Sequence, residues 1–313
     1  MADAPAGDMV SAAMFHGQPC IEISLSQGDR VCIALHGAHV LSWKTADGAE
    51  HLYLSPLAKI DGASPIRGGV PICFPQFNQR VLANLPLPKH GFARTQPWTV
   101  LSVEQSDVQA RAVLQLCSNE VTRAVWPHEF VATLTVKLES GHLQITFDVE
   151  NSDLQPWAFA LALHSYLRVG DIARSHLNGL QGLRYWDGVQ NLTQPEVRHA
   201  QSADPVDGIL HFVSETDRVY EDIHSAAAPA LALEHPGARL EITQSASLSE
   251  VVVWNPGAAL SASLDDLPND GYKQMLCVEA ACINAPVTLA AGRRWSGWQH
   301  LAVADVQPDR STD

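Results

Sequence analysis

Apolar and polar positions alternate along much of the chain. The run HLQITFDVEN, residues 142–151, alternates polar side chains with Leu143, Ile145, Phe147 and Val149. Because successive side chains of a strand point to opposite faces of a sheet, this period of two predicts a half-buried strand. The run FVATLTVKLES, residues 130–140, repeats the pattern, and the Ser140-Gly141 step between the two runs predicts a hairpin.

Further strand-like runs are separated by Gly, Pro, Asn and Asp, which favour turns. They are CIEISL, VCIALHG, ARAVLQLC, PWAFALALHSYLRV, ARLEITQS, EVVVWNP and QMLCVEAAC. Sustained helical periodicity is scarce, and no internal repeat, low-complexity tract or linker forces a second domain. We therefore predict an all-β fold of large antiparallel sheets, as one domain over residues 1–313 with a core from about 15 to 305 and flexible ends.

The overall charge narrows the choice of partners. The 313 residues carry a formal net charge of −14, and 46% of them are hydrophobic. This acidic balance argues against nucleic acid and anionic membranes as partners, because both select a basic surface. No apolar run reaches the roughly 18 residues of a membrane helix, and the first 15 residues lack the Lys or Arg of a signal peptide. Six scattered cysteines without CxxC pairs fit a reducing compartment, so we expect a cytoplasmic protein.

Several motifs that would indicate bound groups are missing from the sequence. Neither HExxH nor a Cys/His cluster at ligand spacing occurs, so no metal is expected. The sequence also lacks GxGxxG, GxxxxGK[ST] and GxSxG, which removes the usual markers of nucleotide binding and of serine hydrolases. We expect an activity that needs no cofactor.

A basic segment interrupts the acidic chain. Residues 62–103 contain no Asp or Glu, but they contain Arg67, Arg80, Lys89 and Arg94. A single arginine is usually a solvated surface residue. Here the motifs RGGVPICFPQF and KHGFAR set the cations beside glycines, which permit close backbone approach. Since Arg offers a planar fork of donors, these loops are predicted to bind a carboxylate or phosphate.

Two titratable residues stand in apolar strands. In PWAFALALHSYLRV, alternation puts Phe159, Leu161 and Leu163 on one face and Ala158, Ala160, Ala162 and His164 on the other. The alanines leave volume, so we expect a cavity floor with an imidazole at its end. Glu279 is the only charge from Met275 to Ile283 and needs a partner or a raised pKa. A histidine satisfied by a backbone carbonyl and a glutamate in a structural ion pair are the alternatives.

Six segments occur in an order that resembles the aldose 1-epimerase superfamily, specifically its hexose-6-phosphate mutarotase branch. They are RGGVPICFPQF, KHGFARTQPW, LALHSYLRVGDI, ETDRVY, VVVWNP and QMLCVEAA. The RGG and HGFAR elements separate this branch from galactose mutarotases. The resemblance implies a galactose-mutarotase-like β-supersandwich and an enzyme without metal or cofactor.

The resemblance also implies roles for individual residues. His164 and Glu279 fall on the family's catalytic histidine and glutamate. The residues expected to bind substrate are Arg67, Lys89, His90, Arg94 and Asp217. The stretch between Asp187 and Thr216 looks longer than in the family, which suggests a loop insertion without an assigned function.

The implied reaction interconverts the α and β anomers of a hexose 6-phosphate by opening the sugar ring. Glu279, as base, takes the proton of the C1 hydroxyl, while His164, as acid, protonates the ring oxygen. This suits a carboxyl whose pKa is raised by its apolar strand and an imidazole held positive by neighbouring acids. We expect a monomeric glucose-6-phosphate 1-epimerase.

Three other functions remain open at this point. A mutarotase of neutral aldoses such as galactose shares the fold, but the basic segment argues against it. A non-catalytic sugar-phosphate-binding module would have no need for both His164 and Glu279. A purely structural sandwich has no specific support in the sequence.

Overall fold

The computed structural model describes residues 12–79, 85–189, 197–199, 209–225, 230–236 and 238–304. Both chain ends, predicted to be flexible, lie outside the described residues. Arg80 and much of the predicted 187–216 insertion lie outside them as well. That the whole chain forms one domain stays a prediction.

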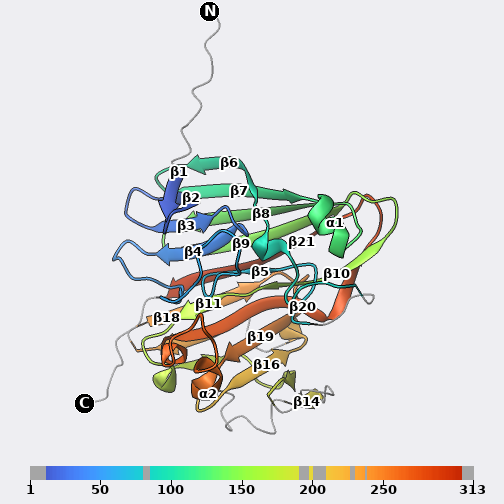
Figure 1. The fold of residues 1–313 in the computed structure, drawn as a ribbon. Helices are drawn as coiled ribbons and strands as arrows, with labels where there is room; N and C mark the ends of the chain where they lie inside the picture. The colour runs from blue at the N-terminus through green and yellow to red at the C-terminus, as the bar shows by residue number, and fades with distance from the viewer. Residues whose placement is uncertain are drawn as a thin grey trace, which may run out of the picture.

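The described residues form three antiparallel sheets, which confirms the all-β prediction. The smallest sheet has the strand order β1-β2-β3-β4. Its strands are β1 (Ala12–Phe15), β2 (Gln18–Ser24), β3 (Arg30–Ala34) and β4 (His39–Lys44). Figure 1 shows this sheet against the part of the molecule that contains β6 and β7, and β2 contacts both strands.

The largest sheet has nine strands in the order β15-β12-β17-β18-β21-β9-β8-β7-β6. In chain order they are β6 (Thr99–Gln105), β7 (Gln109–Cys117), β8 (Phe130–Glu139), β9 (His142–Asn151), β12 (His176–Asn178), β15 (Leu210–His211), β17 (Leu231–His235), β18 (Ala238–Gln244) and β21 (Arg294–Ala304). The predicted hairpin is confirmed, because Glu139 of β8 faces His142 of β9 across the turn.

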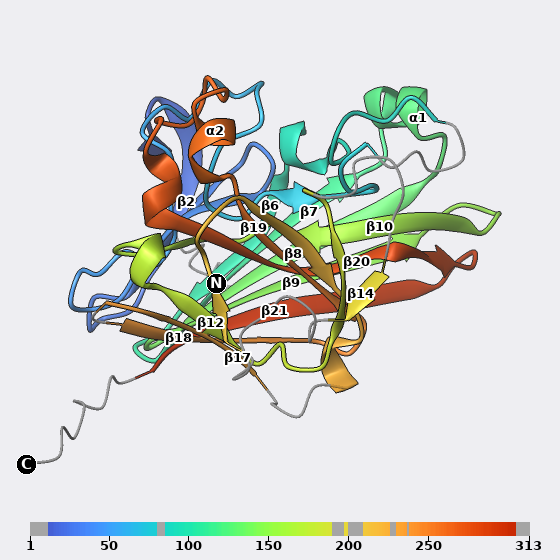
Figure 2. The same cartoon turned by 90° about the horizontal axis from the view of Figure 1, so that it is seen from below.

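The remaining sheet has eight strands and carries the titratable residues singled out above. Its order is β14-β13-β16-β19-β20-β10-β5, and β11 also pairs with β20. The strands are β5 (Ile72–Cys73), β10 (Trp157–Leu163), β11 (Tyr166–Arg168), β13 (Arg184–Asp187), β14 (Val197–His199), β16 (Thr216–Tyr220), β19 (Glu250–Asn255) and β20 (Met275–Leu289). Figure 2 shows the two large sheets stacked as layers, with β19 and β20 in one and β18 and β21 in the other.

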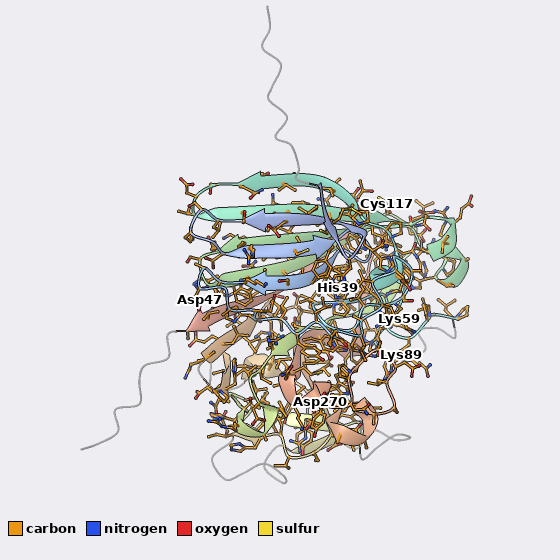
Figure 3. The ribbon with its side chains drawn as sticks, turned by 60° about the vertical axis from the view of Figure 1, so that its left-hand side comes forward. His39, Asp47, Lys59, Lys89, Cys117 and Asp270 are labelled. Carbon is orange, nitrogen blue, oxygen red and sulfur yellow. The ribbon has the colours of Figure 1, made fainter. Side chains whose placement is uncertain are left out.

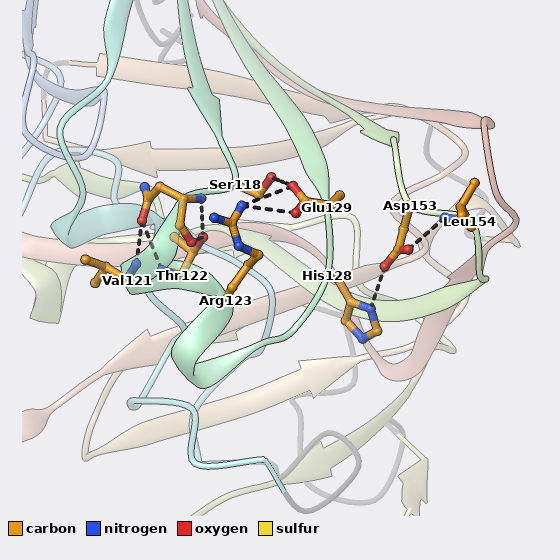
Figure 4. A network of polar contacts seen from close by, with 9 residues as sticks. Ser118, Val121, Thr122, Arg123, His128, Glu129, Asp153 and Leu154 are labelled. Atoms are coloured by element: carbon orange, nitrogen blue, oxygen red, sulfur yellow. Dashed lines mark hydrogen bonds and ion pairs between the residues drawn. The ribbon is translucent and has the colours of Figure 1, made fainter.

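Two short α-helices lie among the described residues, α1 (Glu120–Val125) and α2 (Gly257–Ser261). Four 3₁₀ turns accompany them at Ala93–Thr95, Ile172–Arg174, Ile223–Ser225 and Gly271–Gln274. The side chain of Asn119 caps α1 by accepting from the backbone N–H groups of Val121 and Thr122. Arg123 then pairs with Glu129, 3.0 Å away, and this network joins the helix to the start of β8 (Figure 4).

The main core lies between the two large sheets. Alternate residues of β8 and β9 are buried, as the period of two predicts, and they pack in one cluster with the inward residues of β10, β19 and β20. The core also receives Ile21, Ile23, Val31 and Ile33 from the small sheet. The central strands of the eight-stranded sheet, among them β10, β19 and β20, therefore have one face in this core, and their other face is available for a site.

The segment PWAFALALHSYLRV forms two strands instead of one. The backbone leaves the ladder at His164, whose N–H donates to the carbonyl of Pro71 at 3.0 Å. A register shift opposite β20 also occurs between Phe159 and Leu161. The predicted division of faces nevertheless holds, since Phe159 and Leu161 lie in the main core and Ala162 lies in a separate cluster on the opposite face.

Leu134 and Thr133 are neighbours in β8 on opposite faces, and only Leu134 is fully buried. We expect Leu134→Ala to lower the free energy of unfolding by about 2–5 kcal/mol, because it leaves a cavity between the sheets. Thr133→Ala is the matched control and should cost less than about 1 kcal/mol. Urea denaturation followed by circular dichroism measures both. Equal losses in the two variants would contradict the assignment of faces.

Candidate functional site

The candidate site occupies the face of the eight-stranded sheet that points away from the main core. A small apolar cluster forms its floor, and the members of this cluster are Cys73, Phe77, Ala160, Ala162, Val219, Val252, Ala281 and Ile283. Most of these side chains are small, as the sequence predicted for the β10 part of the face. The titratable residues extend from this floor.

His164 and Glu279 meet at one end of the floor. Glu279 lies opposite Val252 in the β19–β20 ladder, and His164 directly follows β10, which pairs with β20 on its other side. The Nδ1 atom of His164 is 3.3 Å from Oε1 of Glu279, and the two side chains are 9% and 1% exposed. His164 Nδ1 and Glu279 Oε2 form no hydrogen bond with the described residues. Among the described residues, no carbonyl of another residue accepts a hydrogen bond from His164 Nδ1.

The environment shifts the two pKa values in opposite directions. Burial raises the pKa of Glu279 well above its ordinary value, and the nearby charge of Asp217 raises it further. Burial lowers the pKa of His164 well below its ordinary value, and the charges of Arg94 and Arg67 add to the effect. The raised carboxyl pKa was expected. The expectation that acids hold the imidazole positive is wrong for the protein alone, because burial first, and then the charges of Arg94 and Arg67, lower the pKa of His164.

Tyr166 and Trp254 fix the plane of the imidazole. The ring of Tyr166 stacks on His164 with centroids 4.7 Å apart and an angle of 6° between the planes. Trp254 meets both rings edge-on at 6.1 Å. Sequence reasoning gave Tyr166 no role, although it lies two residues after His164 in a quoted segment. Since rings packed on two sides restrict rotation, His164 keeps one orientation toward Glu279.

Arg67 is anchored to the same aromatic group. Its Nη1 atom donates to the hydroxyl of Tyr166 at 3.0 Å, and its Nε atom donates to Oδ1 of Asp266 at 3.1 Å. An arginine has five N–H donors, so donors remain on Arg67 for an anion. Sequence reasoning missed Asp266, because it lies 199 residues further along the chain. The contact with Tyr166 links Arg67 to the ring that packs on His164.

The glycines of the two basic motifs bring the loops close to the protein's own backbone. Gly69 has a φ of +60°, and a Cβ there would lie 2.8 Å from Nε2 of His39. That nitrogen donates to the carbonyl of Gly68 at 2.7 Å. Gly91 has a φ of +70°, and a Cβ there would lie 2.0 Å from the carbonyl oxygen of Phe74. Close approach, predicted from these glycines, therefore sets the position of both loops.

Lys89 and Arg94 come from the second loop, where Lys89 is exposed (Figure 3). Arg94 donates from Nη2 to the carbonyl of Lys89 at 2.8 Å. Burial lowers the pKa of the Lys89 ammonium, and the charges of Arg67 and Arg94 lower it further. Like charges that affect one another in this way lie close together, so the two basic motifs form one cationic cluster: Arg67, Lys89 and Arg94.

His90 lies between the cationic cluster and His164. Its Nδ1 atom accepts from the backbone N–H of Asn78 at 3.2 Å, and its ring meets that of His164 edge-on at 5.6 Å. Burial lowers the pKa of His90 well below its ordinary value, and the charges of His164 and Arg94 add to this. A neutral ring whose Nδ1 accepts carries its proton on Nε2. His90 is thus a neutral donor at the site.

Asp217 lies across β19 from Glu279. It pairs with Trp254 in the β16–β19 ladder, and its charge affects the pKa of both Glu279 and Lys89. A Cβ at Gly188 would lie only 2.5 Å from Oδ2 of Asp217, so the carboxylate fits because position 188 has no side chain. All seven residues predicted from the sequence therefore lie around one part of the sheet. Their roles stay predictions.

Three side chains at the site have atoms that bind metals. The donor atoms of His164, Cys277 and Glu279 all lie within 4.8 Å of one another. Cys277 and Glu279 are two apart on β20 and share a face, whereas His164 comes from another segment. The sequence search found no such cluster, because the three residues are not at a motif spacing.

A separate cavity of about 630 Å³ lies beyond the end of β19. It is lined by residues of α2 and of the turns around it, among them Phe212, Glu215, Asn255 and Tyr272. None of the seven predicted residues lines this cavity. The side chain of Asn255 donates to the carbonyls of Tyr272 and Met275, so it is engaged in holding the turn.

No helix in the described part of the chain is long and apolar enough to span a membrane.

Comparison with known proteins identifies relatives that match most of this chain. A protein of Salmonella typhimurium named "Putative glucose-6-phosphate 1-epimerase" is 38% identical over 257 residues, which are 82% of this chain and 81% of the relative. An Escherichia coli protein of the same name is 37% identical over 252 residues, 80% of this chain and 79% of that relative.

Solved structures show the same fold. The crystal structure of a "putative mutarotase" from Salmonella typhimurium superposes with a TM-score of 0.80 at 33% identity, covering 92% of this chain and 91% of that one. A "galactose mutarotase-like protein" from Lactobacillus casei superposes with a TM-score of 0.72 at 19% identity, covering 91% of this chain and 100% of that one. The predicted galactose-mutarotase-like fold is confirmed. Since the aldose 1-epimerase family model also matches residues 19–302, from β2 to β21, the chain belongs to the aldose 1-epimerase family.

Proposed function

We propose that the protein is a glucose-6-phosphate 1-epimerase, which interconverts the α and β anomers of the sugar phosphate. The observation that carries this proposal is the position of the cationic cluster beside the buried pair of His164 and Glu279. An acid and a base in contact suit proton transfer, and clustered arginines suit a phosphate. The names of the relatives support the same substrate.

Ring opening requires one proton to leave the C1 hydroxyl and another to reach the ring oxygen. Glu279 takes the first and His164 gives the second, while the bond between C1 and the ring oxygen breaks. The aldehyde turns about the C1–C2 bond, and closure reverses both transfers. The pair holds one proton throughout, on His164 before opening and on Glu279 after it. In the protein alone, the raised pKa of Glu279 and the lowered pKa of His164 favour this proton on Glu279, so substrate binding must shift it to His164 before the ring opens.

The phosphate group of the substrate changes the charge around His164. In the protein alone, the cationic cluster disfavours a protonated His164. A bound phosphate carries about −1.5 to −2 charges and offsets these cations, which raises the pKa of His164 in the complex. Arg67, Arg94 and Lys89 bind the phosphate, Asp217 accepts from a sugar hydroxyl, and His90 donates from Nε2.

The cluster argues against neutral aldoses as the main substrates, because it would stay uncompensated beside them. The presence of both His164 and Glu279 argues against a non-catalytic sugar-phosphate-binding module. We further propose that the enzyme acts as a cytoplasmic monomer without metal or cofactor.

Removal of the base tests the chemistry directly. Glu279→Gln keeps the shape of the side chain but accepts no proton, so we expect kcat for glucose 6-phosphate to fall by about 10²- to 10⁴-fold. Exchange NMR between the anomers measures the rate. Glu241→Gln, at an exposed position of β18, is the control and should keep full activity. Turnover retained by Glu279→Gln would overturn its assignment as base.

Removal of the cationic cluster tests the substrate. For Arg67→Ala and Arg94→Ala, we expect kcat/KM for glucose 6-phosphate to fall by roughly 10- to 100-fold each, because a hydrogen bond to a charged group is lost. The value for free glucose should change little. Arg111→Ala, on the distant β7, is the control. Equal losses for the two sugars would contradict phosphate binding by the cluster.

The pH dependence tests the coupling between phosphate and imidazole. The pair must keep one proton, so activity falls as pH rises through its higher pKa. Since bound phosphate raises this pKa, the alkaline limb of kcat for glucose 6-phosphate should lie at higher pH than the limb of kcat/KM. For free glucose the two limbs should coincide. Coinciding limbs for both sugars would show that the cluster does not act on His164.

A further inference from the structure

We propose that His164, Cys277 and Glu279 form a binding site for a thiophilic divalent metal ion such as Zn²⁺, and that this ion inhibits the enzyme. Binding of the metal does not depend on the proposed function. Inhibition does, because it assumes that His164 and Glu279 carry out the proton transfers. The metal is thus an inhibitor of this site and takes no part in the reaction.

The spacing of the donor atoms fits such an ion. His164 Nδ1 and Glu279 Oε1 are 3.3 Å apart. Two ligand atoms about 2.1 Å from one tetrahedral Zn²⁺ are separated by roughly 3.4 Å. The sulfur of Cys277 lies within 4.8 Å of the other two donors, so a shift of about 1 Å in its side chain reaches the 2.3 Å bond typical of Zn–S.

Two buried atoms at the site also lack partners. His164 Nδ1 and Glu279 Oε2 have no hydrogen-bond partner among the described residues, although both side chains are more than nine-tenths buried. Polar atoms in such positions are nearly always satisfied. A metal ion between His164 Nδ1 and Glu279 Oε1 would give His164 Nδ1 a partner, and the fourth tetrahedral position would stay open for water.

The donor set selects the class of metal. One imidazole nitrogen, one thiolate and one carboxylate suit Zn²⁺ or Co²⁺. Mg²⁺ prefers six oxygen ligands, so a set with one nitrogen, one sulfur and one carboxylate fits it poorly. When the metal binds, the S–H bond of Cys277 breaks and a metal–sulfur bond forms, and both the thiol proton and the proton held by the His164–Glu279 pair leave to solvent. The thiolate and carboxylate charges then neutralise the ion.

Cobalt spectroscopy of the full chain tests the site without reference to activity. We expect Co²⁺ to bind with a stoichiometry of one and to give a thiolate-to-cobalt charge-transfer band. Cys277→Ala should lose this band. Cys282→Ala should keep it, since Cys282 lies on the core face of the same strand. A band that persists in Cys277→Ala, or no band in the wild-type protein, would overturn the proposal.

Kinetics tests the consequence of binding. Zn²⁺ should raise the apparent KM for glucose 6-phosphate, and EDTA should restore the original value, whereas Mg²⁺ at the same concentration should have no effect. In Cys277→Ala the inhibitory Zn²⁺ concentration should rise at least about tenfold. Inhibition that does not depend on substrate concentration, or that is unchanged in Cys277→Ala, would overturn the proposal. If the wild-type protein shows no epimerase activity, the proposed function fails, while the cobalt experiment still decides the metal site.

Discussion

The burial of Glu279 beside His164 is the constraint on which the rest of the site depends. A carboxylate in an apolar sheet is unstable as an isolated charge, so it must share a proton or face an opposite charge. The sheet keeps it there because β20 is an interior strand, paired with β19 on one side and β10 on the other. Glu279 therefore lies on the face that points away from the main core, in contact with His164, and in the proposed reaction one proton moves between the two residues.

The cationic cluster belongs to loops, whereas the proton-transfer pair belongs to the sheet. Close backbone packing at Gly69 and Gly91 fixes the position of the loops. Hydrogen bonds to Asp266 and Tyr166 fix the position of the Arg67 side chain. Tyr166 contacts both parts of the site, since it accepts from Arg67 and stacks on His164. The residues proposed for phosphate binding and for proton transfer thus belong to one connected group of side chains.

The sequence allowed most of the fold to be predicted, because one-sided burial imposes a period of two that is visible in β7, β8 and β9. The basic motifs and the isolated Glu279 stood out for similar local reasons. The break at His164 was missed, because it depends on a hydrogen bond to Pro71. Asp266 and Cys277 gave no local signal, since their importance arises from contacts between distant segments. The pKa direction of His164 was missed for the same reason, because its burial and its cationic neighbours both depend on segments distant in the sequence.

The alternation within β20 has a consequence for how the strand can change. Leu276, Val278 and Ala280 face the core, whereas Cys277 and Glu279 face the site. Deletion of one residue ahead of Glu279 would exchange these faces, so that the carboxyl would enter the core and an apolar side chain would replace it beside His164. A change of length inside β20 would therefore exchange its two faces, whereas a change of length in the turns at its ends would preserve them.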